Sequence, residues 1–107
     1  MKFGLKQRDI ENITLALKKI PEIEEAIIFG SRAMGNYKKG SDIDLSIKGN
    51  NISHRTLSNL KYLLEEELPI PFFFDIIDYG KISSEKLIEH IDRVGVVFYR
   101  LENSLGM

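Results

Sequence analysis

Residues 30–45 read GSRAMGNYKKGSDIDL, and this stretch decides how the rest of the sequence is interpreted. It opens with a Gly-Ser pair, a turn that lets a phosphate approach the backbone closely. Ten residues separate Ser31 from Asp42, which forms an Asp-x-Asp pair with Asp44. A phosphate-binding turn and a paired-carboxylate metal site this close in sequence indicate chemistry on a nucleoside triphosphate.

The sequence on either side of this stretch alternates between helical and strand patterns. Apolar residues at steps of three and four mark helices, and apolar runs or strict alternation mark strands. We expect helices over 7–20, 53–68 and 83–93, a helical turn over 31–35, strands over 26–29, 42–48, 72–77 and 96–99, and a loose tail over 102–107. No long crossover joins the first two strands, which favours antiparallel pairing. The expected fold class is α/β (α+β), with a small mixed β-sheet of about four strands flanked by about three helices.

The bulk composition predicts one small domain that spans residues 1–107. The chain is 43% hydrophobic and 29% charged, and it has no cysteine, so its core is built without disulfides. No apolar run suits a signal peptide or a membrane span, which predicts a cytoplasmic location. A net charge of −1 argues against binding to long nucleic acid and favours small nucleotides or another protein. The apolar segments 72–74 and 96–98 suit either the core or a subunit interface, which leaves a homo-oligomer open.

Three aspartates are the candidate metal ligands and catalytic groups. Asp42 and Asp44 share one face of a predicted strand, roughly 6.6 Å apart at their Cα atoms, and carboxylates suit Mg²⁺ or Mn²⁺. The alternative is that both simply face solvent. Asp75 interrupts the apolar run 72–77, where a charge is costly unless it is paired, hydrogen-bonded or on a metal. Its alternatives are an ion pair with Arg or Lys, or a place at an exposed sheet edge. Asp78 points to the opposite face and is not an expected ligand.

Gly30, Ser31 and Arg32 are the candidates for binding the phosphates of a nucleotide. A short helix beginning at Ser31 would offer free backbone amides, and the Ser31 hydroxyl would add a hydrogen bond. The guanidinium of Arg32 could neutralise a phosphate. The alternative is a plain strand-to-helix turn, since the stretch matches neither G-x-G-x-x-G nor the P-loop. His54 and His90 have no partner at metal-ligand spacing and are expected to be solvated surface residues.

The motif GSRAMG-x5-SDIDL, followed downstream by FFFDIID, resembles the nucleotidyltransferase superfamily related to DNA polymerase beta. More narrowly, nearly the whole chain is similar to the minimal nucleotidyltransferases of bacteria and archaea, which are stand-alone domains of about this length. The resemblance implies the nucleotidyltransferase fold and two bound Mg²⁺ ions. Met34 stands where a basic residue is common in that family, so no phosphate contact from this position is available.

The same resemblance implies a role for each matching residue. Asp42 and Asp44 would bind the metal ions that hold the triphosphate. Asp75 would hold the ion beside the attacking hydroxyl and could accept its proton. Gly30 and Ser31 would cradle the terminal phosphates.

Minimal members of this superfamily are also similar to antitoxins that neutralise a HEPN-domain toxin. The resemblance therefore implies a metal-dependent enzyme that transfers AMP from ATP to a hydroxyl of a HEPN-domain partner. The alternative is a non-catalytic antitoxin that acts by binding, with a vestigial or regulatory nucleotide site. A third interpretation, transfer to a small molecule such as an antibiotic, is disfavoured because we expect no acceptor-binding domain.

Overall fold

The computed structural model of this chain describes residues 2–102, so the tail expected over 102–107 lies almost entirely outside the described residues. The elements follow in the order α1 (Gln7–Lys18), β1 (Glu25–Phe29), α2 (Gly30–Met34), β2 (Ile43–Lys48), α3 (His54–Tyr62), η1 (Leu63–Glu67), β3 (Phe74–Asp78), η2 (Tyr79–Lys81), α4 (Glu85–Val94) and β4 (Val96–Arg100). Here η1 is a short π-helix and η2 a 3-10 turn. The described range thus holds four α-helices where about three were expected, because the predicted turn at 31–35 is the short helix α2.

The four strands form one mixed sheet in the order β3-β2-β1-β4. Strand β1 pairs antiparallel with both β2 and β4, while β2 pairs parallel with β3. The α/β fold class and the antiparallel pairing of the first two strands are confirmed. The register places Asp44 opposite Phe29 on one side and opposite Asp75 on the other. The Asp-x-Asp pair therefore lies at the start of the inner strand β2, beside the end of β1 and the start of β3.

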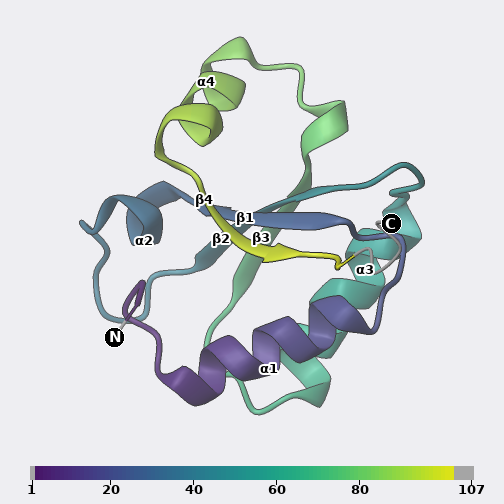
Figure 1. Cartoon of the computed structure of the whole chain (residues 1–107). Helices are drawn as coiled ribbons and strands as arrows, with labels where there is room; N and C mark the ends of the chain where they lie inside the picture. Colours follow the sequence, from purple (N-terminus) through teal and green to yellow (C-terminus); the bar gives the residue numbers. More distant parts are fainter. Residues whose placement is uncertain (1, 103–107) are drawn as a thin grey trace.

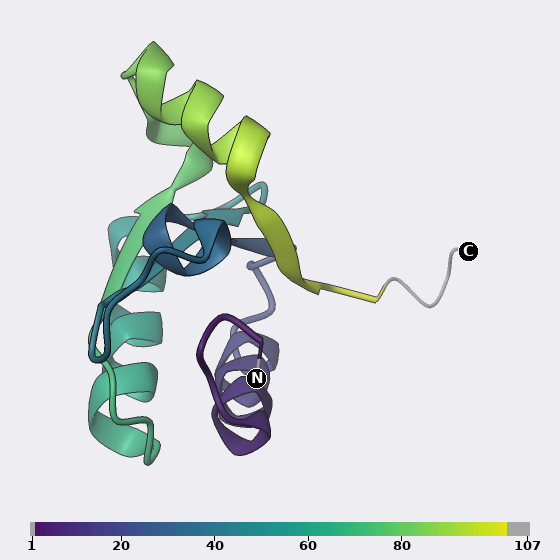
Figure 2. The same cartoon turned by 90° about the vertical axis from the view of Figure 1, so that its left-hand side faces the viewer.

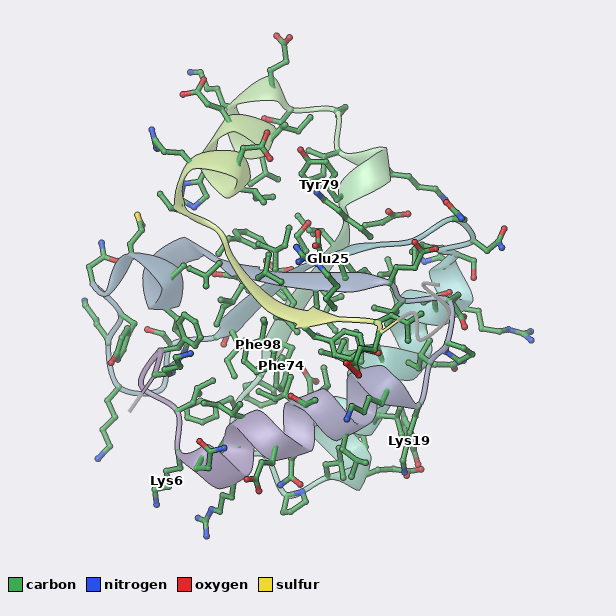
Figure 3. The ribbon with its side chains drawn as sticks, viewed as in Figure 1. Lys6, Lys19, Glu25, Phe74, Tyr79 and Phe98 are labelled. Carbon is green, nitrogen blue, oxygen red and sulfur yellow. The ribbon has the colours of Figure 1, made fainter. Side chains whose placement is uncertain are left out.

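The helices cover the two faces of the sheet unequally. Helices α1 and α3 lie on one face and α4 lies on the other, as both views show (Figures 1 and 2). The α1 and α3 side holds the main core, into which Phe74 and Phe98 point (Figure 3). The opposite face holds a smaller apolar cluster around Ile27, Phe29 and Ile91. Polar site residues can therefore occupy the part of this face that α4 leaves uncovered.

Alternation along β2 explains how the strand serves both faces. Ile43, Leu45 and Ile47 are fully buried in the main core. Because side chains alternate along a strand, Asp44 and Ser46 point to the other face, toward α4. The interior therefore fixes the strand register, since a slip of one residue would bury Asp44 in the main core.

Local sequence fixes several of the element ends. The Ser53 side chain accepts a hydrogen bond from the Thr56 amide and caps α3, and Ser84 caps α4 through the Leu87 amide. Strand β3 begins at Phe74, two residues later than expected; Phe72 packs on a neighbouring guanidinium, and Phe73 is 71% exposed. None of the helices in residues 2–102 combines the length and apolarity that crossing a bilayer requires.

Candidate active site

Gly30 joins β1 to α2 and lies directly against Asp44. Its φ of +70° falls in the left-handed region, which favours glycine. A Cβ atom added at this position would overlap the Asp44 carboxylate. The backbone conformation favours glycine here, and any larger residue would also displace the Asp44 carboxylate. Ser31 follows as the second residue of α2 and is half-buried.

The three candidate aspartates occupy adjacent positions at one end of β2 and β3. Asp42 is exposed and immediately precedes β2, while Asp44 is the second residue of that strand and is partly buried. Asp75 is exposed on β3, which forms one edge of the sheet. Its position at a sheet edge is one of the alternatives raised from the sequence, and no ion pair holds it within the described residues. The same edge position places it beside Asp44.

Electrostatics indicate that these carboxylates act on one another. Burial raises the pKa of Asp44 above its ordinary value, and the negative charges of Asp75 and then Asp42 raise it further. The basic groups of His90 and Arg32 oppose this rise in the Asp44 pKa. Repulsion of this kind is what a divalent cation relieves, and an all-oxygen donor set suits Mg²⁺. Within residues 2–102, however, no three ligand-type side chains are already arranged to hold a metal ion.

Arg32, the third phosphate-binding candidate, is only 2% exposed. Its Nε and Nη2 atoms donate to the Ser41 carbonyl at 3.0 and 2.7 Å, and Nη1 donates to the Phe3 carbonyl at 2.8 Å. The guanidinium also lies against the rings of Tyr37 and Phe72, at 5.1 and 4.6 Å from their centroids. Arg32 therefore holds the loop that leads from α2 to Asp42, and its donors are directed at backbone carbonyls.

His90 is a neighbour of the site that the sequence did not indicate. The expectation of a solvated surface residue is wrong, because His90 is half-buried and its ring meets Phe29 edge-on with centroids 6.1 Å apart. Phe29 is the strand partner of Asp44 and directly precedes Gly30. The only signal in the sequence was the place of His90 beside the inward-facing Ile91. The apolar pattern of the sequence does not indicate that α4 packs against the end of β1.

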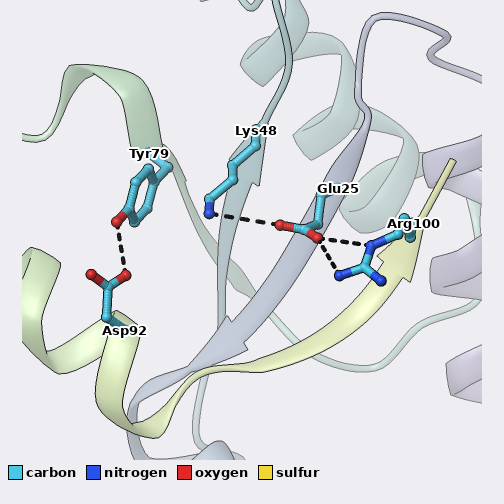
Figure 4. Close-up of polar contacts among 5 residues, drawn as sticks. All are labelled: Glu25, Lys48, Tyr79, Asp92 and Arg100. Carbon is cyan, nitrogen blue, oxygen red and sulfur yellow. Dashed lines mark hydrogen bonds and ion pairs between the residues drawn. The ribbon is translucent and has the colours of Figure 1, made fainter.

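A row of polar contacts holds α4 and the turn before it against the sheet (Figure 4). The Tyr79 hydroxyl donates to Asp92 of α4 at 2.7 Å, and the Lys48 ammonium lies 4.2 Å from the centroid of the Tyr79 ring. Lys48 is also 3.7 Å from Glu25, which accepts two hydrogen bonds from Arg100. Through η2, these contacts link α4 to β2, β1 and β4, and they help to fix the position of the helix that carries His90.

Two hollows flank the site without including the three aspartates. One, of about 430 Å³, lies behind the loop that Arg32 holds and is lined by Tyr37, Lys38, Lys39 and Phe72 among others. The other, of about 460 Å³, lies between the starts of α3 and α4 along β3. Asp42 and Asp75 are exposed, so the candidate site lies open to solvent at the ends of β2 and β3.

The chain matches the family model described as polymerase beta, nucleotidyltransferase, over residues 11–104. It therefore belongs to the polymerase beta-like nucleotidyltransferase family, as the sequence motif predicted. No curated protein sequence matches this chain significantly.

Several solved structures share the fold. A toxin–antitoxin complex with AMP-PNP is 18% identical, with 89% of this chain and 76% of that chain covered and a TM-score of 0.71. An MntA–HepT toxin–antitoxin complex is 18% identical over 92% of this chain and 76% of that chain, with a TM-score of 0.66. A complex of an MNT antitoxin with the tri-AMPylated HEPN toxin of Shewanella oneidensis is 17% identical over 95% and 78%, with a TM-score of 0.67. At these identities the likeness establishes the fold.

Proposed function

We propose that this protein transfers AMP from ATP to a hydroxyl group of a HEPN-domain partner in a metal-dependent reaction, and that it acts as an antitoxin. The observation that carries the proposal is the position of Asp44. Its carboxylate lies against Gly30, and Asp44 pairs with Asp75 across β2 and β3. The negative charge of Asp42 helps to raise the pKa of Asp44. A cluster of like charges beside a glycine turn stabilises nothing by itself, which points to a ligand that neutralises it.

The proposed reaction is a substitution at the α-phosphorus of ATP. The acceptor hydroxyl oxygen forms a bond to this phosphorus, the bond to the bridging oxygen breaks, and pyrophosphate leaves. The proton of the hydroxyl passes to Asp75, which is exposed at the sheet edge and open to an incoming acceptor. Phosphoryl-type transfer depends on in-line positioning and charge neutralisation more than on covalent catalysis. The residues of this site suit both tasks.

The metal ions would be held by Asp42, Asp44 and Asp75, with Mg²⁺ preferred and Mn²⁺ as a substitute. Bound Mg²⁺ neutralises phosphate charge and activates an attacking oxygen. Asp44 would orient the triphosphate from its position between the other two carboxylates. Gly30 leaves room for the backbone to approach a phosphate, and the half-buried Ser31 hydroxyl would donate a hydrogen bond to it.

A HEPN-domain protein is proposed as the acceptor because one structure with this fold is a complex of an MNT antitoxin with a tri-AMPylated HEPN toxin. The AMP-PNP in a toxin–antitoxin complex of the same fold supports an adenine nucleotide as the donor. The open sheet edge at Asp75 adds to this argument, since a protein acceptor has to reach the nucleotide from outside.

The proposal is tested by incubating the protein with Mg²⁺, ATP labelled at the α-phosphate and a HEPN-domain protein encoded by a neighbouring gene. We expect the label to appear on the HEPN protein and to fall by at least about 100-fold in Asp42→Asn/Asp44→Asn, since the variant removes charge that acts on the transition state. Asp78→Asn is the matched control, because Asp78 lies on β3 like Asp75 but points to the other face.

Label that is absent with the wild type, together with a tight complex that the double variant also forms, would overturn the enzymatic proposal in favour of neutralisation by binding. Label that persists in the double variant would overturn the assignment of Asp42 and Asp44. Label that is lost equally in Asp78→Asn would also count against it.

A further inference from the structure

The candidate site is short of basic side chains for a triphosphate. Arg32 directs its guanidinium at the carbonyls of Ser41 and Phe3. Met34 carries no charge, and Lys38 and Lys39 line the hollow behind the loop. Ser31 contributes only a hydroxyl. The proposed nucleotide brings several negative charges to a site that already holds three carboxylates, so a further hydrogen-bond donor would strengthen phosphate binding beside the proposed metal ions.

His90 occupies the position such a donor needs. Its ring packs edge-on against Phe29, with an angle of 80° between the ring planes. Phe29 directly precedes the Gly30 turn and is paired with Asp44. His90 and Arg32 are the two basic residues whose charges act on Asp44, and of these two Arg32 is buried. His90, on α4, is only half-buried.

The helix around His90 is held firmly enough to position a ligand-binding group. The next residue, Ile91, is buried in the small apolar cluster with Ile27 and Phe29. The residue after that, Asp92, accepts the 2.7 Å hydrogen bond from Tyr79. Hydrogen bonds from a group fixed in this way lose less conformational entropy on binding.

We infer that His90 binds the phosphates of the nucleotide, donating a ring N–H to a phosphate oxygen from the α4 side of the site. This inference rests on the proposed function and adds to it a binding residue on a helix that carries none of the motif. A neutral imidazole keeps one N–H donor, so the role does not require a protonated ring. The ligand class is a nucleoside triphosphate or its inorganic polyphosphate portion.

The test compares His90→Phe with the wild type. Phenylalanine keeps an aromatic ring against Phe29 but removes both nitrogen atoms, so packing is retained while the donor is lost. Binding of a non-hydrolysable ATP analogue, of tripolyphosphate and of adenosine is measured by calorimetry in the presence of Mg²⁺. His54→Phe is the matched control, because His54 is an exposed residue at the start of α3.

We expect His90→Phe to weaken binding of the ATP analogue and of tripolyphosphate by about tenfold or more, as loss of a hydrogen bond to a charged group does. Adenosine affinity should be unchanged, and His54→Phe should bind all three ligands like the wild type. His90→Arg, which restores a donor of higher charge, should recover at least part of the lost affinity. Thermal unfolding of each variant without ligand checks that the fold is retained.

The outcomes separate this inference from the proposed function. If the wild type binds the ATP analogue and His90→Phe binds it equally well, the inference is wrong while the proposed function stands. If His90→Phe weakens adenosine and tripolyphosphate alike, the effect is one of packing and the phosphate role is also wrong. If the wild type binds neither the analogue nor tripolyphosphate, both proposals fail together.

Discussion

Asp44 is the residue of the site whose ionised form is destabilised by its surroundings. It is partly buried, it lies between Asp75 and Asp42, and its pKa is raised above the ordinary value of 3.8 by burial and then by those two charges. A raised pKa means that the folded protein binds a proton more tightly than the unfolded chain. Stability therefore falls as the pH rises from 3.8 through the raised value, and at neutral pH the full penalty is present.

Replacing this carboxylate by an amide should remove the penalty. We expect Asp44→Asn to raise the Tm by a few degrees at pH 7 without Mg²⁺, since Asp44 is only partly buried and solvent screens the repulsion. Below about pH 3 both proteins carry a neutral group at this position, so the difference should vanish. Calorimetric scans across pH measure this. A variant that is less stable than the wild type at pH 7 would contradict the described repulsion.

Single residues also show how far sequence reasoning reaches. The sequence placed Asp75 inside an apolar strand, and the pairing of β2 with β3 brings it opposite Asp44. The metal and nucleotide roles of Asp42, Asp44 and Asp75 stay predictions. The environment of Arg32 was not predictable, since its partners, the carbonyls of Phe3 and Ser41, belong to segments that only tertiary structure brings together.

At the scale of elements, β3 starts at a clamp made by the turn of helix before it. Lys61 and Glu65 form an ion pair at 3.1 Å. The Glu65 carboxylate accepts the Phe74 amide at 2.8 Å, and the Lys61 ammonium donates to the Phe74 carbonyl at 2.8 Å. Because β3 is an edge strand, these backbone groups have no neighbouring strand on that side. The clamp therefore satisfies them one residue before Asp75.

Breaking this clamp should loosen the start of β3. Glu65→Ala removes the acceptor of a partly buried amide and the partner of Lys61, so we expect a loss of about 1–3 kcal/mol in unfolding free energy. Glu65→Gln keeps an acceptor and should lose less. Glu66→Ala, on the exposed side of the same turn, serves as the control and should change stability by about 0.5 kcal/mol at most. Urea unfolding gives the three values, and equal losses at positions 65 and 66 would argue against the clamp.

The helical segment that carries the clamp differs from its sequence prediction. Leucine spacing predicts one helix over 53–68, but the last turn widens into the π-helix Leu63–Glu67, in which the Leu68 amide donates to the Leu63 carbonyl. Periodicity over a few residues does not distinguish the two helix types. The strands and the other helices differ from prediction by at most two residues at most ends, since their apolar patterns and caps are local.

At the scale of the whole molecule, the two faces of the sheet differ in what they bury. The face under α1 and α3 carries the large apolar core, and the other face carries a small cluster together with the carboxylates. The helices, the strands and the α/β fold class could be predicted from the sequence, because they follow from local apolar patterns. The alternation along β2 also predicted which of its residues face the core. The sequence did not predict the place of α4, which depends on contacts of Tyr79 with Asp92 and Lys48 that are remote in sequence.

Ligand binding at the proposed site should stabilise the whole domain. A ligand that binds only the folded state at roughly 100 times its Kd adds about 2.7 kcal/mol, which for a domain of this size raises the Tm by about 10 °C or more. We therefore expect a rise of this order with saturating Mg²⁺ and ATP, measured by thermal unfolding. ATP with a chelator should give a smaller shift, and Asp42→Asn/Asp44→Asn should lose most of it. An unchanged Tm in the wild type at millimolar Mg²⁺ and ATP would count heavily against the site.

The overlap between a Cβ atom at position 30 and the Asp44 carboxylate has a genetic consequence. Even the smallest side chain there would displace the central acidic group and impose an unfavourable backbone angle at the same time. In a selection for loss of function, alanine or serine at position 30 should therefore be recovered beside changes in the aspartates.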